Sequence, residues 1–152
     1  MKNILLLGML FLSSMLFAQE GQDSKNFSTV EIPVDFGNRQ TQLITEVYGD
    51  YAQKLLTDPS LSRTFKLLLS ERMHIKYLKY NPTEKYQILT SATLKNQYNK
   101  NLRHDDSFDK ETFNPLKYNL ELFSNLQKIY RIGTTDYLLV IDPQVIPNTK
   151  KI

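Results

Sequence analysis

The chain has 152 residues, of which 41% are hydrophobic, 23% charged and 11% aromatic, and a formal net charge of +3. This composition excludes collagen-like and low-complexity chains, and nine Tyr and eight Phe with so small a charge exclude a wholly disordered one. The absence of Cys excludes disulfides, thiol catalysis and Cys-ligated zinc.

Residues 1–18 have the pattern of a secretory signal peptide. Lys2 supplies a positive start, residues 4–17 are apolar apart from two serines and a glycine, and Ala18 precedes a polar stretch. The apolar run is shorter than the roughly 20 residues of a membrane-spanning helix. We therefore predict export, to the periplasm or out of the cell, with no membrane span after cleavage. Loss of Lys2 leaves a net charge of +2, which does not favour a nucleic-acid partner.

Residues 19–40 are predicted to form an extended N-terminal arm. Apolar and polar residues alternate from Val30 to Phe36, which is the period of a half-buried strand. Because proline cannot donate a ladder hydrogen bond, Pro33 favours a strand at a sheet edge.

Two helices are predicted next. Between Thr41 and Leu56 the apolar residues form one wide stripe, which suits packing against a sheet. Asp58 is a good N-cap, and Pro59 a good first residue, for a second helix that ends near Ser70.

Three strands are predicted after the helices. Residues 72–80 alternate, with His74 on a solvated basic face. Residues 128–132 and 137–141 are rich in β-forming residues, and residues 133–136 between them predict a hairpin loop. The strand at 137–141 is apolar on both faces, which indicates a central position in the sheet.

Residues 83–126 have no clean period. Residues 96–109 are rich in Asn, Lys and Asp, which is typical of a loop. Asn114-Pro115 indicates a helix start with Asn114 as its cap. The alternation that begins at Leu116 indicates a strand, and both alternatives stay open.

These elements predict an α+β fold. Two N-terminal helices pack on a small antiparallel β-sheet, and helix 41–56 covers one face of the sheet. The sheet carries a long irregular insertion, residues 83–126. The predicted domain spans residues 41–144, and a polar C-terminal tail, residues 145–152, follows it. A chain near this size buries roughly 70% of its unfolded surface, so one core is feasible without disulfides.

The candidate binding surface interleaves basic and aromatic side chains. Such surfaces stack on bases or sugars, and tyrosine anchors many protein interfaces. The alternative is that the rings cap the core with lysine stems lying over them. The candidate residues are Lys76, Tyr77, Lys79, Tyr80 and Tyr86, and Tyr98 with Lys100 continues the pattern.

A weaker candidate for metal or acid–base chemistry is the run His104, Asp105 and Asp106. A histidine beside carboxylates can bind a divalent metal or transfer a proton. The spacing matches neither an EF-hand nor H-E-x-x-H, and the alternative is a solvated loop. The sequence contains no nucleophile elbow, phosphate-binding loop or dinucleotide fingerprint. We therefore predict no catalytic residue and no cofactor.

Four stretches carry a family resemblance: SERMHI at residues 70–75, YNPTEKY at 80–86, FNPLKYNL at 113–120, and YRI at 130–132 with TDY at 135–137. They resemble a group of small exported bacterial proteins of unknown activity, over roughly residues 68–144. The resemblance implies export and assigns no functional residue.

We expect a non-enzymatic exported domain that binds another protein or a surface polymer. One alternative is a cell-envelope hydrolase that uses carboxylates and His104, which requires His104 and two carboxylates to converge in a cleft. The other is a structural accessory protein that assembles through an exposed sheet edge.

Overall fold

The computed structural model of the chain describes residues 29–144. The predicted signal peptide, the first part of the predicted arm and the predicted tail lie outside the described residues. Residues 29–144 contain three α-helices and five strands, which confirms the α+β class. No helix in this range combines the length and the apolar character needed to cross a membrane.

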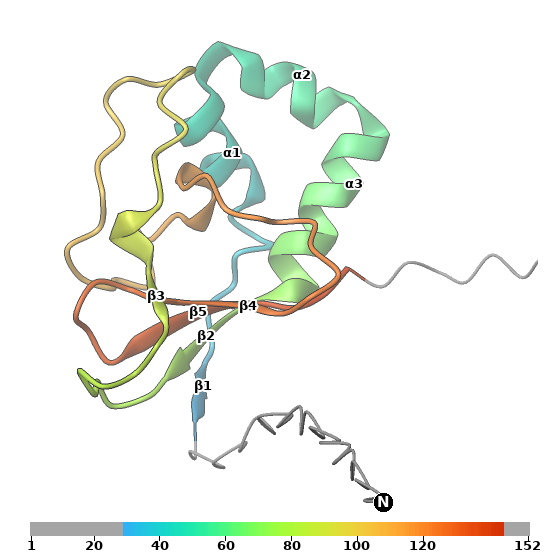
Figure 1. The fold of residues 1–152 in the computed structure, drawn as a ribbon. Helices are drawn as coiled ribbons and strands as arrows, with labels where there is room; N and C mark the ends of the chain where they lie inside the picture. Colours follow the sequence, from blue (N-terminus) through green and yellow to red (C-terminus); the bar gives the residue numbers. More distant parts are fainter. Residues whose placement is uncertain (1–28, 145–152) are drawn as a thin grey trace, which may run out of the picture.

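The five strands form one sheet in the order β1-β2-β5-β4-β3 (Figure 1). Three neighbouring pairs are antiparallel, but β3 runs parallel to β4. The prediction of a purely antiparallel sheet is therefore wrong, because the chain crosses from β2 to the far edge of the sheet before it runs along β4. The strands are β1 (Val30–Ile32), β2 (Met73–Tyr77), β3 (Gln87–Ile88), β4 (Lys128–Arg131) and β5 (Tyr137–Ile141).

Two positions in the sheet agree with the sequence patterns. Strand β1, which Pro33 follows, lies at one edge, and β5, which is apolar on both faces, lies in the centre. Strands β4 and β5 form the predicted hairpin, in which Gly133 adopts a φ of 58°. That left-handed conformation favours glycine because it lacks a Cβ atom.

The predicted helix over residues 41–56 is divided in two. Helix α1 (Gln40–Tyr48) ends at Gly49, whose φ of 51° is left-handed, and a 3₁₀ turn leads into α2 (Ala52–Thr57). A glycine that adopts this conformation terminates a helix, because the α-helical hydrogen bonds cannot continue through it.

Helix α3 (Pro59–Leu67) begins where its cap predicts. The Asp58 carboxylate accepts hydrogen bonds from the amides of Ser60 and Leu61, at 2.9 and 3.0 Å. The helix then changes to a π turn over Leu68–Arg72 that leads directly into β2.

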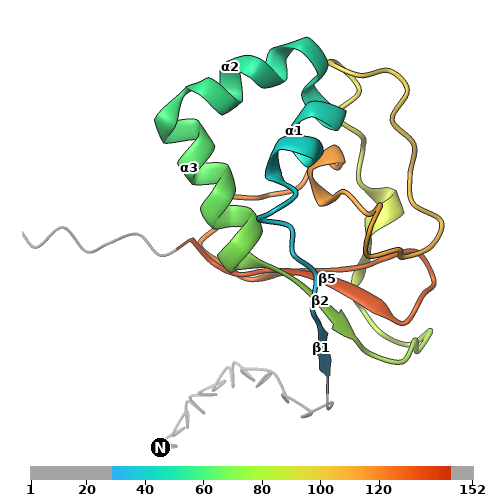
Figure 2. The same ribbon diagram turned by 180° about the vertical axis from the view of Figure 1, so that it is seen from behind.

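The helices and most of the insertion lie on one side of the sheet (Figures 1 and 2). Leu43, Ile44 and Val47 of α1 are buried in one cluster with Ile75 of β2 and Leu139 of β5. A smaller cluster covers the opposite face of the sheet. It contains Leu78, Leu138 and Val140, with Tyr86 and Ile129 packed against them.

Asn114 is the cap that the sequence predicts, but the residues after it form neither a helix of more than one turn nor a strand. Asn114 caps a single 3₁₀ turn, Pro115–Lys117, and Tyr118 then forms an isolated bridge with Leu94. The Asn114 amide is buried and donates to the backbone oxygen of Leu43, at 3.0 Å. This contact fastens the insertion to α1.

Candidate functional site

The predicted tyrosine and lysine surface is organised around a buried arginine. Arg131 is 2% exposed, and its guanidinium carbon lies 5.7 Å from the ring centroid of Tyr80 and 5.6 Å from that of Tyr86. Its Nη1 donates to the Leu78 carbonyl at 2.7 Å, and its Nη2 pairs with Glu84. Aromatic rings stabilise such a desolvated cation. Two of the predicted rings therefore hold an arginine of the chain itself, beside a hollow of only about 90 Å³.

Tyr77 is also engaged within the chain. Its hydroxyl donates to Asp136 at 3.0 Å, and this hydrogen bond raises the pKa of the Tyr77 phenol. Lys76 is half-buried in β2, and Lys79 is exposed. The five predicted residues lie at one end of the sheet, and their role in binding stays a prediction.

The predicted His104 cluster holds the insertion together. Asp105 accepts from the Lys117 ammonium and from the Tyr118 hydroxyl, both at 2.7 Å. Lys117 is only 7% exposed, so Asp105 compensates a buried charge. Burial, followed by the Asp105 hydrogen bond, raises the pKa of Tyr118. Asp106 and His104 are exposed, with the His104 ring 5.7 Å from that of Tyr118.

No three His, Cys, Asp or Glu side chains gather as a metal site within residues 29–144. His104 lines none of the hollows beside β1, α1, α3, Tyr80 or Lys110. The convergence on which the hydrolase alternative depends is not seen there.

His74 is partly exposed on the face of β2 that it shares with Lys76, and two carboxylates contact its ring. Its Nδ1 lies 3.3 Å from a Glu31 carboxylate oxygen, and its Nε2 lies 3.1 Å from one of Asp142. Because β1 pairs with β2 and β5 ends beside β2, the strand neighbours bring carboxylates to both ring nitrogens. The imidazole therefore links three segments of the chain.

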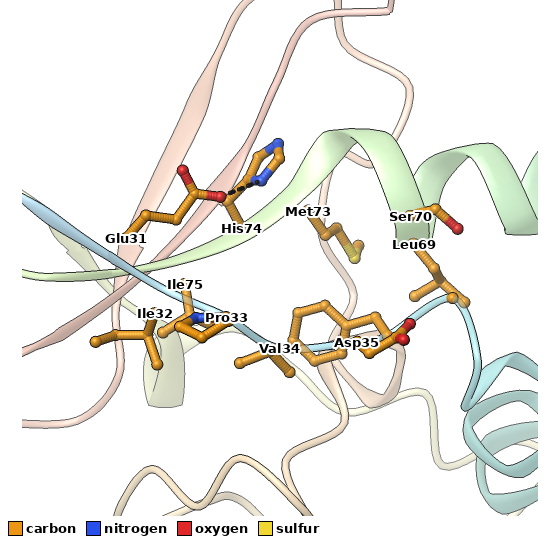
Figure 3. Close-up of a pocket in the computed structure, with 12 residues that line it drawn as sticks. Glu31, Ile32, Pro33, Val34, Asp35, Leu69, Ser70, Met73, His74 and Ile75 are labelled. Atoms are coloured by element: carbon orange, nitrogen blue, oxygen red, sulfur yellow. Dashed lines mark ion pairs between the residues drawn. The ribbon is translucent and has the colours of Figure 1, made fainter.

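A hollow of about 410 Å³ lies between residues 31–37 and the start of β2 (Figure 3). Figure 3 shows Glu31 beside His74 at one end and Asp35 with Ser70 at the other. Glu31 is paired with His74, and Asp35 accepts from the Asn38 amide at 2.9 Å. Ligand sites depend on a few polar groups that converge on the ligand. In this hollow, the carboxylates of Glu31 and Asp35 instead bind groups of the chain itself.

A hollow of about 360 Å³, here called the tyrosine groove, opens between the end of α1 and the insertion. It combines two tyrosine rings with amide side chains and one ammonium group. The amide residues and Tyr98 are exposed. The lining residues are Tyr48, Leu94, Lys95, Asn96, Gln97, Tyr98 and Asn119.

The break in the helix at Gly49 places the aromatic wall of the tyrosine groove. Tyr48 is the last residue of α1, and Tyr51 follows in the 3₁₀ turn. The Tyr98 ring from the insertion lies 5.3 Å from the Tyr48 ring, centroid to centroid. It stacks on the Tyr51 ring at 5.2 Å with an interplanar angle of 15°. Such ring pairs stabilise one arrangement of the side chains.

One hydrogen bond holds the insertion against α1, and another joins two segments of the insertion itself. The Asn99 side chain donates to the Glu46 carbonyl at 2.7 Å. The Lys95 amide donates to the Lys117 carbonyl at 2.8 Å, next to the bridge between Leu94 and Tyr118. The groove is therefore bounded by segments that hydrogen bonds fix in place.

The lining of the tyrosine groove contains a single charged residue, Lys95. Lys95 is half-buried, with its Nζ 6.0 Å from the Tyr48 ring centroid, and burial lowers the pKa of this ammonium. Burial, and to a smaller extent Tyr98, raises the pKa of Tyr48, which keeps that phenol neutral. No lining residue carries a carboxylate. The groove therefore presents one positive charge beside neutral donors and acceptors.

The sequence does not predict the tyrosine groove. Of its lining residues, only Tyr98 belongs to the predicted pattern of basic and aromatic side chains. Tyr48 and Tyr51 belong to the apolar stripe of the predicted helix, which assigns them to the core. The run Tyr48-Gly49-Asp50-Tyr51 carries a signal, since a glycine inside a helical pattern marks a possible break. With the break in place, the two tyrosines no longer share one helical face.

Comparison with known proteins finds no matching family model, no matching curated protein and no matching solved structure. The family resemblance noted from the sequence therefore stays a prediction. Any function of the chain has to be inferred from its own geometry.

Proposed function

We propose that this chain is an exported, non-enzymatic binding domain whose tyrosine groove holds a saccharide chain of a surface polymer. The observation that carries the proposal is the meeting of the Tyr48 and Tyr98 rings with three amide side chains in one hollow of about 360 Å³. The predicted signal peptide supports export of the domain to a place where such polymers occur.

The chemistry of the lining suits a sugar ring. A pyranose has a face of C–H groups and a rim of hydroxyl groups. Tyrosine offers an apolar ring with a polar tip to the face, and side-chain amides supply both donors and acceptors to the rim. The volume lies within the range of small-ligand sites, and a net charge of +2 after cleavage gives little support for a nucleic acid.

The test measures binding of the cleaved chain, residues 19–152, to a panel of neutral and acidic polysaccharides by affinity electrophoresis and calorimetry. We expect Tyr98→Ala to weaken binding about tenfold, because it removes one stacking ring. Tyr77→Ala is a matched control, since Tyr77 is 37% exposed and Tyr98 is 42% exposed. It should bind as the parent chain does.

Circular dichroism establishes that both variants keep the fold. If Tyr98→Ala binds normally while Tyr77→Ala loses binding, the ligand occupies the sequence-predicted surface, and the groove proposal is wrong. If the parent chain binds no polysaccharide of the panel, the saccharide proposal as a whole is overturned.

A further inference from the structure

Resting on the proposed function, we infer that the tyrosine groove selects a sugar unit bearing a single negative charge, which the Lys95 ammonium group binds. The juxtaposition of Lys95 with the Tyr48 ring, in a lining without carboxylates, points to this ligand. The inference concerns which saccharide is held, and it can fail while saccharide binding itself stands.

Lys95 has no counter-charge within residues 29–144. None of the six ion pairs within residues 29–144 includes Lys95. The two buried cations of that region differ in this respect, because Lys117 pairs with Asp105 and Arg131 pairs with Glu84. A partly desolvated cation is costly without a counter-charge. An anionic ligand would supply that counter-charge to Lys95.

The number and shape of the donors indicate one charge on the ligand. An ammonium group is a compact point charge, whereas bidentate recognition of a phosphate uses the planar fork of arginine. The remaining polar side chains of the groove are neutral amides, from Asn96, Gln97 and Asn119. A sugar carboxylate or a sulfate ester, flanked by hydroxyl groups, matches this set.

Lys54 adds to the field without entering the groove. It is exposed, and its Nζ lies 5.4 Å from the centroid of the Tyr51 ring, which stacks on Tyr98. A second positive charge at this distance raises the local concentration of an anionic polymer at low ionic strength. It therefore assists approach, while Lys95 makes the contact.

The test compares three probes: polygalacturonate, which carries carboxylates, dextran sulfate, which carries sulfates, and neutral dextran. We expect the parent chain to bind an anionic probe at least tenfold more tightly than dextran. Lys95→Met should lose this preference and Lys95→Arg should keep most of it. Lys100→Met, which removes an exposed charge of the same insertion, is the control and should behave as the parent.

Each outcome decides one point. Preference for polygalacturonate or for dextran sulfate identifies the anionic group, and loss of that preference in Lys95→Met but not in Lys100→Met supports the inference. Equal loss in both variants shows a general charge effect and overturns it. Equal binding of dextran and the anionic probes, unchanged by Lys95→Met, overturns the inference and leaves the proposed function standing. Tighter binding of an oligothymidylate than of every polysaccharide overturns both.

Discussion

Asp136 fastens the β4–β5 hairpin to the end of β2. Its carboxylate accepts from the Tyr80 amide at 2.7 Å and from the Tyr77 hydroxyl at 3.0 Å. These bonds, that of the Tyr80 amide first, hold the pKa of Asp136 below its ordinary value. A carboxyl with a depressed pKa in the folded state stabilises the fold above its unfolded pKa of about 3.9. That stabilisation is lost as the pH falls through the folded-state pKa.

We therefore expect Asp136→Asn to be less stable than the parent chain at neutral pH, and the difference to shrink below about pH 4. Urea unfolding at several pH values measures this difference. Asp50→Asn, which removes an exposed aspartate from the 3₁₀ turn after α1, controls for loss of charge and should give a small difference throughout. A gap for Asp136→Asn that stays constant down to strongly acidic pH would contradict the assignment.

Side-chain roles were only partly accessible from the sequence. The composition around Tyr80 and Tyr86 predicts rings near positive charge, and the structure places both rings near a cation. The cation is Arg131, which lies 45 residues or more further along the chain. No local pattern shows that this arginine is buried beside those rings. The sequence therefore cannot distinguish tyrosines that bind a ligand from tyrosines that pack against Arg131.

At the scale of elements, the Asp58 cap sets the start of α3. Its carboxylate satisfies two amides that would otherwise lack an acceptor in the first helical turn. We expect Asp58→Ala to lower the free energy of unfolding by about 1 kcal/mol. Ser60→Ala, at an exposed position two residues later, is the matched comparison and should cost clearly less. Equal losses in thermal and urea unfolding would show that the cap is not the cause.

Elements with strong local signals were predictable. The Asp58-Pro59 helix start, the apolar run of β5 and the hairpin before it all depend on residues close together in the chain. Two other features were not predictable: the break of the helix at Gly49 and the parallel pairing of β3 with β4. A two-residue strand has no periodicity of its own, and its partner lies about 40 residues away. Only its pairing with β4 defines β3 as a strand.

At the scale of the whole molecule, both edges of the sheet are poor templates for pairing with another chain. Strand β1 has three residues and is followed by Pro33, and β3 has two residues. Short edge strands and edge prolines protect proteins against edge-to-edge association.

We therefore expect the cleaved chain to sediment as a monomer over a wide concentration range. A variant with Val30→Lys and Ile88→Lys, which places a charge on each edge, should have the same mass in analytical ultracentrifugation. A mass that rises with concentration in the parent chain, and does not rise in this variant, would instead support assembly through a sheet edge.

The tyrosine groove is also a property of the whole molecule. Tyr48 and Tyr98 are 50 residues apart, and they meet only because the insertion folds back onto α1 through Asn99 and Asn114. The sequence pattern includes Tyr98, but the apolar stripe of the predicted helix places Tyr48 in the core. A site assembled from distant segments becomes visible only when the packing is known.

The central position of β5 affects how the chain can fold during synthesis. Strand β5 bridges β2 and β4, yet it is the last of the five strands to leave the ribosome. Until it emerges, β2 lacks its inner neighbour, and the apolar side chains of α1 and β2 lack the surface on which they pack. Pairings between such distant segments also form slowly. The sheet is therefore completed only after translation of nearly all of the described chain, so the chain stays unfolded for most of its synthesis, as export through the predicted signal peptide would require.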